Sequence, residues 1–364
     1  MKRSLVASAL AVVASALTLV QLAAVPAQAT SGIGEQAVIT GRAWPAAFTF
    51  APNGRIYYAE RYSGRIKIWS PSSGTTAFFY RVTNLRTRGE GGVLGIALDP
   101  NYASGSPFVY VYATRLVGGV EKGQILKMKY VNGTATDVTT IFTSPEVTGT
   151  DHVGGRLLFG PDGMLYLIIG DSQRSGNAQD TGTSFGKMLR MTSSGHTPSG
   201  NQYPGREWAI GIRNSYGFTF DFAHTGLMWE TENGPECNDE LNQIDGGNNQ
   251  GWGPNENCDG TSPDDTNNSG TDPVFPLLWY TPTIAPTGAV FCDGCGLTGA
   301  DGDLFFGTYN TANIHEVTLT SDRTGVTGDS IVLTHSEGVL SMERGPDGTI
   351  YFSDSNAIYK LVNT

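Results

Sequence analysis

The stretch that decides the fold is DHVGGRLLFGPDGMLYLIIGD, residues Asp151 to Asp171. Its centre, GPDG, predicts a tight turn, because glycine tolerates a positive φ and a Pro–Asp pair presets turn geometry. The short apolar runs on either side, residues 156–160 and 164–169, predict the two strands of a hairpin. The outer ends of this hairpin bring His152 and Asp171 to the same edge of the sheet.

An imidazole beside a carboxylate is the smallest arrangement that makes a general base with an orienting partner. His152 is one of only five histidines in the chain, and Asp171 ends the second strand. The same pattern also fits a histidine that only caps or hydrogen-bonds a loop. The hairpin by itself leaves a catalytic pair and a structural pair both open.

Strand pairs of this kind recur along the chain around turns rich in Gly, Pro, Asp and Asn. No segment has a sustained helical period with capping residues. Six such units predict an all-β repeat architecture, and short antiparallel sheets repeated around an axis form a β-propeller. We therefore expect one six-bladed β-propeller domain over residues 30–364, with segment 35–42 closing the ring as an outer strand.

The N-terminal segment, residues 1–29, has the pattern of a secretory signal peptide. It begins with Lys2 and Arg3, continues as a long apolar run and ends in an A-x-A site at residues 27–29. We expect cleavage near Ala29 and a secreted, extracellular protein. No other stretch is long and apolar enough to cross a membrane, so no membrane span is expected after cleavage.

Charge and cysteine content narrow the class of protein further. A formal charge of −11 with scattered Lys and Arg argues against nucleic acid as a partner. Four cysteines in an exported chain predict disulfides rather than free thiols. Of the three possible pairings we expect Cys237–Cys258 and Cys292–Cys295. A zinc site is the alternative, although no histidine is spaced to complete it.

Polar residues recur at strand ends in several units, where a propeller brings them to one face around its axis. They are Glu90 in GEGGVLG, His152 and Asp171 in the hairpin, Arg213 and Asn214 in GIRNSYG, Glu232, Asn233, Gly234 and Pro235 in ENGP, and Thr283 in PTIAPTG. Each residue alone fits an ordinary turn or surface position. Their repetition at equivalent places predicts a shared site.

The longest irregular stretch, residues 236–272, is rich in Asn, Asp and Gly. Its oxygen atoms, including those of Asp239 and Glu240, suit calcium, a hard cation that takes six to eight oxygen ligands. The pattern is not that of an EF-hand. A solvated loop stapled by a disulfide is the alternative interpretation.

Five motifs together resemble the secreted, soluble sugar dehydrogenases that use pyrroloquinoline quinone (PQQ), the glucose/sorbosone dehydrogenase family of six-bladed propellers. The motifs are GEGGVLGIALDPNY, DHVGGRLLFGPDGMLYLIIGD, GIRNSYGFTFD, ENGPECNDELNQIDGGNNQGW and PTIAPTG, in family order over nearly the whole mature chain. The resemblance implies oxidation of an aldose at its anomeric carbon to a lactone, with PQQ and calcium as cofactors. It also implies a sugar substrate, an external electron acceptor and a monomer or homodimer.

By match of motif, the resemblance assigns a role to each candidate residue. His152 is the catalytic base, Asp171 its partner, and Arg213 polarises the quinone carbonyl. The remaining assignments are Asn214, Asn233 and Thr283 to the cofactor, Glu90 and Asp151 to the sugar, and the carbonyls of Gly234 and Pro235 with Asp239 and Glu240 to the metal.

The chain departs from the family pattern at three positions that usually carry a cation. Asn310 stands in place of a lysine, and Gly338 and Leu340 stand in place of two arginines. PQQ carries three carboxylates, so the resemblance implies fewer charge-assisted contacts to it in this chain. Two alternative functions stay open: a calcium-bearing propeller hydrolase or lactonase without quinone, and a non-catalytic propeller that binds a glycan or a protein.

Overall fold

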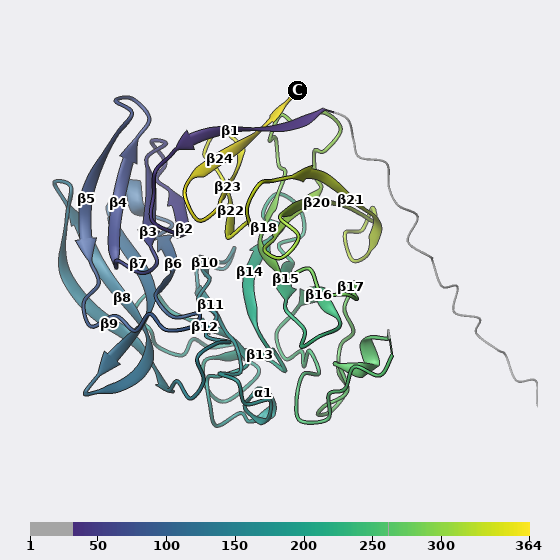
Figure 1. Ribbon diagram of the computed structural model, residues 1–364. Coiled ribbons are helices and arrows are strands. Elements are labelled where there is room, and N and C mark those ends of the chain that lie inside the picture. Colours follow the sequence, from purple (N-terminus) through teal and green to yellow (C-terminus); the bar gives the residue numbers. More distant parts are fainter. Residues whose placement is uncertain (1–31, 261) are drawn as a thin grey trace, which may run out of the picture.

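The computed structural model describes residues 32–260 and 262–364, which form six four-stranded antiparallel sheets. Figure 1 shows these sheets as blades arranged around a common axis, with almost no helix. The predicted six-bladed β-propeller is therefore confirmed. The predicted signal peptide, residues 1–29, lies outside the described residues.

The four strands of each blade are given in order from the strand nearest the axis to the outermost strand. The first three blades comprise β2 (Pro45–Phe50), β3 (Ile56–Glu60), β4 (Arg65–Ser70) and β5 (Thr75–Arg81); β6 (Val93–Leu98), β7 (Phe108–Val117), β8 (Val120–Val131) and β9 (Thr134–Glu146); and β10 (Leu157–Phe159), β11 (Leu165–Ile169), β12 (Lys187–Met191) and β13 (Glu207–Ile210).

The last three blades follow the same order, except that the outermost strand of the sixth comes from the N-terminal part of the chain. They comprise β14 (Ser215–Phe220), β15 (Met228–Glu232), β16 (Asp239–Ile244) and β17 (Leu278–Tyr280); β18 (Pro286–Phe291), β19 (Leu304–Thr308), β20 (Asn313–Leu319) and β21 (Val326–Thr334); and β22 (Ser341–Arg344), β23 (Ile350–Ser353), β24 (Ile358–Asn363) and β1 (Ile33–Ile39).

Within residues 32–260 and 262–364, helical structure is confined to three single turns in the connections. They are η1 (Tyr102–Ser104), α1 (Gly176–Gln179) and η2 (Pro263–Asp265). In the described part of the chain, no helix has the length and apolar character needed to span a membrane.

The innermost strands bring the connecting loops together. Strand β2 contacts β6, β6 contacts β10, β14 contacts β18, and β18 contacts β22, which in turn contacts β2. The innermost strands of all blades run in the same direction along the axis, so the segments that lead into them lie on one face of the ring. This face carries the candidate site residues that precede β6, β10 and β14.

The predicted hairpin around GPDG is β10–β11. Leu157 pairs with Leu167, and Phe159 pairs with Leu165. Gly163 closes the turn with a φ of 74°, a conformation that favours glycine because it lacks a Cβ. The hairpin prediction is confirmed, with a first strand shorter than expected.

The hydrophobic core is divided among the contacts between blades. Within residues 32–260 and 262–364, six clusters of buried apolar side chains are present. One of them packs Phe48 and Tyr58 of the first blade against Ile358 of the last. Because each sheet buries both faces against its neighbours, the blades stabilise one another only as a closed ring.

Strand β1 closes the ring. It runs antiparallel to β24, with Ile33 opposite Asn363 and Ala37 opposite Tyr359, and Figure 1 shows β1 beside β24 near the C-terminus. The predicted closing strand is confirmed, although it begins and ends slightly earlier than segment 35–42. The pairing covers what would otherwise be an open sheet edge.

Both predicted disulfides are present. Cys237 and Cys258 lie with their Cα atoms 5.8 Å apart, and the Cα atoms of Cys292 and Cys295 are 5.0 Å apart. The zinc alternative is therefore wrong, since all four sulfurs are used in disulfides.

A buried histidine ties the closing strand to the last blade. His335 contacts Glu35 of β1 through Nδ1 at 2.7 Å and Asp354 through Nε2 at 3.1 Å. Burial alone would lower the pKa of His335, but the hydrogen bonds and charges of Asp354 and Glu35 outweigh it and raise this pKa. With an acceptor at each ring nitrogen, His335 binds as an imidazolium.

We expect His335→Gln to lower the free energy of unfolding by about 1–3 kcal/mol near pH 5.5, because two carboxylates lose a charged donor. The folded-state pKa is raised, so this contribution is complete below the ordinary value of 6.5 and is lost as pH rises through the folded value. Urea unfolding from pH 5 to pH 9, with the exposed His196→Gln as control, measures it. A wild-type advantage that grows with pH would contradict the imidazolium.

Candidate active site

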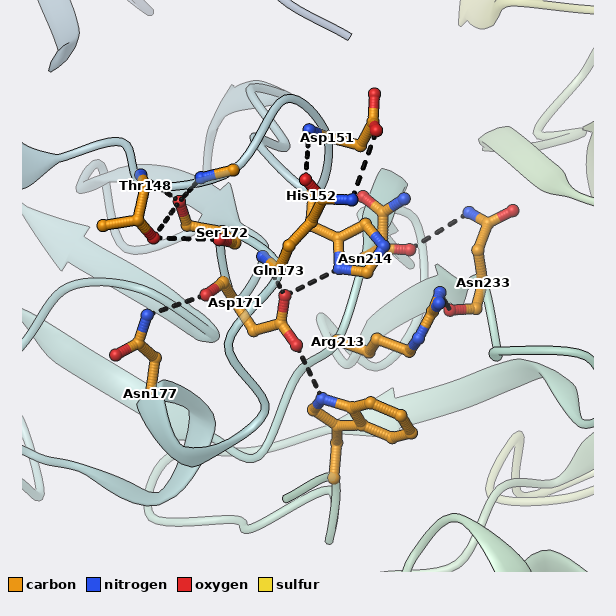
Figure 2. A network of polar contacts seen from close by, with 12 residues as sticks. Thr148, Asp151, His152, Asp171, Ser172, Gln173, Asn177, Arg213, Asn214 and Asn233 are labelled. Atoms are coloured by element: carbon orange, nitrogen blue, oxygen red, sulfur yellow. Dashed lines mark hydrogen bonds and ion pairs between the residues drawn. The ribbon is translucent and has the colours of Figure 1, made fainter. Parts of the chain in front are cut away.

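The two ends of the β10–β11 hairpin meet at a histidine–aspartate pair. Nδ1 of His152 lies 2.6 Å from Oδ1 of Asp171, as Figure 2 shows. The His152 side chain is 13% exposed and that of Asp171 is 2% exposed. His152 adopts a φ of 60°, and a Cβ on the following Gly154 would lie 2.5 Å from the carbonyl oxygen of Ile168. The glycine therefore lets the loop fold tightly against β11.

Asp171 is held from several sides. Its Oδ1 also accepts the backbone N–H of Gln173 at 2.8 Å, and its Oδ2 accepts Nε1–H of Trp252 at 2.8 Å. Its backbone carbonyl accepts from Asn177 at 2.8 Å. An ionised carboxylate only accepts, so Nδ1 of His152 carries the proton and Nε2 is left as the basic nitrogen. This is the arrangement of a general base with a fixed tautomer.

Glu90 joins three blades at the site. Its Oε2 accepts the backbone N–H of His152 at 2.5 Å, and its Oε1 accepts Nδ2 of Asn214 at 3.2 Å. Asp151, next in the chain to the histidine, binds Thr150 Oγ1 at 2.7 Å. Glu90 thus fixes the loop that carries the histidine, and Asp151 is left partly exposed beside it.

Arg213 lies on the other side of the pair. Its Nη1 donates to the carbonyl oxygen of Asn233 at 2.7 Å, and its guanidinium lies 5.2 Å from the ring centre of Trp252. Burial lowers the pKa of Arg213, while the charges of nearby carboxylates such as Asp171 act in the opposite direction. The amide of Asn233 donates to the carbonyl of Asn214 at 3.0 Å. Figure 2 shows this group converging on His152 and Asp171.

A cavity of roughly 390 Å³ adjoins this network. Its lining comprises Trp44, Ala46, Arg61, Tyr62, Gly89, Glu90, Leu94, Asn214, Tyr216, Asn233, Ala285, Thr287, Tyr309, Asn310 and Leu340. Three predicted site residues, Glu90, Asn214 and Asn233, are among them. His152, Asp171 and Arg213 are not; His152 and Arg213 join the lining through their hydrogen bonds to Glu90 and Asn233. Thr283 is not either, and Ala285 and Thr287 from the same motif line the cavity instead.

The turn after β15 presents free carbonyl groups. Within the described residues, no hydrogen bond reaches the carbonyl oxygen of Gly234 or Pro235. Both oxygens of Asp239 are used by backbone donors: Gly234 at 2.8 Å, and Ile284 and Ala285 at 2.6 Å each. Asp239 therefore braces the turn, and the two carbonyls are the free oxygen donors.

Three carboxylates lie buried behind this turn, on β15 and β16. Glu232 lies opposite Glu240 in the ladder, and Glu230 is nearby on the same strand. Burial raises the pKa of Glu240 to about 7 and that of Glu230 to about 8. Burial, together with the charges of its two neighbours, raises the pKa of Glu232 well above its usual value. Such a group either keeps protons near neutral pH or is matched by a cation.

A second group of possible metal ligands lies at the opposite end of β14. Asp221, His224 and Asp293 have ligand atoms within 4.8 Å of one another. Arg323 binds the two oxygens of Asp221 at 2.5 and 3.0 Å, and Arg344 binds Asp293 at 3.0 Å. Because two guanidinium groups already neutralise the two carboxylates, this group does not favour a cation.

The sequence of the chain matches one known family over almost its whole length. The model of the glucose/sorbosone dehydrogenase family covers residues 43–363. The chain belongs to this family.

Relatives with known names agree with this assignment. Aldose sugar dehydrogenase YliI of Escherichia coli (strain K12) is 26% identical over 324 residues, 84% of this chain and 86% of that protein. Quinoprotein glucose dehydrogenase B of Acinetobacter calcoaceticus is 28% identical over 242 residues, 57% of this chain and 50% of that protein. The PQQ-bound aldose sugar dehydrogenase of Streptomyces coelicolor superposes with a TM-score of 0.79 and 26% identity, covering 93% and 99% of the two chains. The protein is therefore an oxidoreductase of the sugar dehydrogenase type.

Two residues of this sugar dehydrogenase were not singled out by the sequence. Trp252 lies in the NNQGW part of a family motif, but its bond to Asp171 spans 81 positions and has no local signature. Arg61 follows β3 in a plain turn, and only the closed ring brings it to the cavity. Both roles depend on contacts between blades, which residue spacing does not encode.

We expect Trp252→Phe to lower sugar dehydrogenase turnover about 10- to 100-fold, because Asp171 loses one charge-assisted hydrogen bond while the ring beneath Arg213 is kept. Dye-linked oxidation of aldoses measures the effect. Trp208→Phe, a partly buried tryptophan that stacks on Arg190 instead, is the matched control. Equal turnover in the two variants would mean that Trp252 does not support the base.

Proposed function

We propose that this sugar dehydrogenase oxidises an aldose at its anomeric carbon to the lactone, with PQQ as redox cofactor and calcium as the metal. The observation that carries the proposal is the His152–Asp171 pair, with Nε2 free and a guanidinium close by, beside a cavity of roughly 390 Å³. A base, a cation and a space of this size suit a planar cofactor next to a sugar.

The residues at the cavity fit such a cofactor. Oδ1 of Asn214 and Nε of Arg213 are buried without a hydrogen-bond partner among the described residues, so each can bind a polar group of a ligand. The free carbonyls of Gly234 and Pro235 are hard oxygen donors of the kind that calcium prefers. Glu240 and its two buried neighbours supply negative charge behind them.

The chemistry divides between cofactor and protein. Bound PQQ supplies the acceptor for the hydride that leaves the anomeric carbon. Nε2 of His152 takes the proton of the anomeric hydroxyl, because Asp171 holds the proton on Nδ1. The buried carboxylate stabilises the imidazolium that forms. We assign Asp151 and Glu90 to the sugar side. Oδ2 of Asp151 accepts from Thr150 and Gln173, and its Oδ1 is left to accept from a sugar hydroxyl.

The cellular setting is also part of the proposal. We infer secretion with cleavage near Ala29, and two disulfides fit an oxidising compartment. Electrons pass from the protein to an external acceptor, and the protein acts as a monomer or homodimer without nucleic acid.

The decisive test is titration of the calcium-loaded protein with PQQ, followed by absorbance and by aldose-dependent dye reduction together. We expect saturable binding with turnover. His152→Ala is expected to bind PQQ within a few-fold of wild type and to lose about 10²- to 10⁴-fold in turnover, the usual contribution of a general base. The exposed His196→Ala is the control.

Other results of this titration would redirect the assignment. Full turnover by His152→Ala would remove the proposed base. Absence of PQQ binding, together with turnover of a lactone, would replace the dehydrogenase by the quinone-independent hydrolase. Absence of both would leave a binding propeller.

Calcium is tested by thermal unfolding with millimolar calcium or a chelator. We expect calcium to raise Tm more at about pH 8.5 than at about pH 6, because the raised pKa values of Glu230 and Glu240 make protons compete with the cation below about pH 8. Glu240→Gln is expected to reduce this gain, and the exposed Glu236→Gln to leave it unchanged. A calcium effect independent of pH and of Glu240 would exclude these carboxylates from the metal site.

A further inference from the structure

The cavity contains a cation that no predicted role uses. Arg61 lies in the turn between β3 and β4 and lines the cavity. Its guanidinium lies 4.9 Å from the ring centre of Tyr62 and 5.8 Å from that of Trp44. Its Nε donates to the carbonyl of Gly91 at 3.2 Å, and its Nη2 donates to that of Gly89 at 3.0 Å. Two rings and two carbonyls therefore hold it in place.

The charge of Arg61 is not matched by the protein. Among the described residues, no carboxylate lies within ion-pair distance of it, and no hydrogen bond is formed by its Nη1. The two fully buried arginines of the described residues do pair: Arg86 with Glu121, Arg156 with Glu343. A guanidinium that is positioned, flanked by aromatic rings and left unpaired is prepared for an anion from outside the chain.

The positions where the family resemblance implies further cations are neutral in this chain. Asn310 and Leu340 line it as neutral residues. A Cβ at Gly338 would lie 2.5 Å from Cδ2 and 2.6 Å from the carbonyl oxygen of Tyr309, so a long side chain there requires Tyr309 to move. Arg344 does not replace them, because it binds Asp293 at the far end of the blade. Among the residues that line the cavity, Arg61 is the one cation.

We propose that Arg61 is a cofactor-binding residue that takes a carboxylate of the planar anionic ligand in this cavity, so that the cation comes from the first blade and not from the fifth and sixth. The inference rests on the proposed function for the identity of the ligand as PQQ. Its physical basis, an unpaired guanidinium clamped at the cavity by Trp44 and Tyr62, is independent of the redox chemistry.

The experiment compares an acid with its ester, because a purely structural arginine would affect both alike. Wild type, Arg61→Gln and Arg61→Lys are titrated with PQQ and with its trimethyl ester, following tryptophan fluorescence and calorimetry. Arg65→Gln, an exposed arginine at the start of β4, is the control. We expect Arg61→Gln to bind the acid about 10- to 100-fold more weakly, with the ester unchanged and with a smaller salt dependence.

Two outcomes of these titrations would contradict the inference, and Arg61→Lys serves as the second variant. Unchanged acid binding in Arg61→Gln, or an equal loss for acid and ester, would overturn it and leave the PQQ assignment intact. If Arg61→Gln does not fold, Arg61→Lys carries the test: a loss of about tenfold for the acid alone supports the inference, and an equal loss for both contradicts it.

A probe without redox chemistry separates this inference from the proposed function. If wild type does not bind PQQ at all, the proposed function fails, and benzene-1,3,5-tricarboxylate decides the role of Arg61. Binding of the tricarboxylate that disappears in Arg61→Gln supports an anion site. No binding of it by wild type overturns the inference as well.

Discussion

The antiparallel pairing of β1 with β24 is the constraint on which the rest of the structure depends. Each blade has two apolar faces and can bury them only against its two neighbours. Without β1 the last sheet has an open edge, and the cluster that contains Phe48, Tyr58 and Ile358 loses Ile39. Glu90, His152 and Arg213 enter from three different blades, so the contacts among them exist only in the closed ring. The site therefore depends on strands that contribute no residue to it.

The sequence predicts contacts between residues that are close along the chain, and it misses contacts that form between different blades. The GPDG turn and its flanking apolar runs are adjacent in the chain, so the hairpin and the meeting of His152 with Asp171 follow from turn chemistry alone. The disulfides follow from the presence of four cysteines in a chain expected to be exported. The closing strand follows from the need to pair the last strand of the ring. Trp252 reaches Asp171 across 81 positions, and no period or spacing announces such a contact. Asp239 illustrates the same limit. The sequence identifies it as a possible metal ligand, but only the fold shows that its carboxylate accepts three backbone N–H groups.

Charge is distributed unevenly across the site. Behind the Gly234–Pro235 turn, three acids are buried together without an arginine or lysine paired to their side chains within the described residues. On the cavity side, the opposite holds: Arg61 is an unpaired cation, and the carboxylate of Glu90 is committed to His152 and Asn214. A buried acid cluster attracts a cation, and an unpaired guanidinium attracts an anion. The same face of the propeller thus offers complementary places for a metal ion and for a carboxylate.

This distribution of charge separates two properties of the site: the geometry of the proposed base and the affinity for a cofactor. The proposed base is preorganised by contacts internal to the chain, since His152, Gln173 and Trp252 all bind Asp171. Under the proposed function, cofactor affinity depends instead on cations around the cavity, and the family resemblance implies that Asn310, Gly338 and Leu340 stand where three cations are usual. Loss of those cations acts on binding of the ground state and leaves the geometry of proton transfer untouched. Under the proposed function, a chain with this pattern is therefore expected to need more cofactor and to catalyse normally once it is bound, and the strength of the contact made by Arg61 decides how much more.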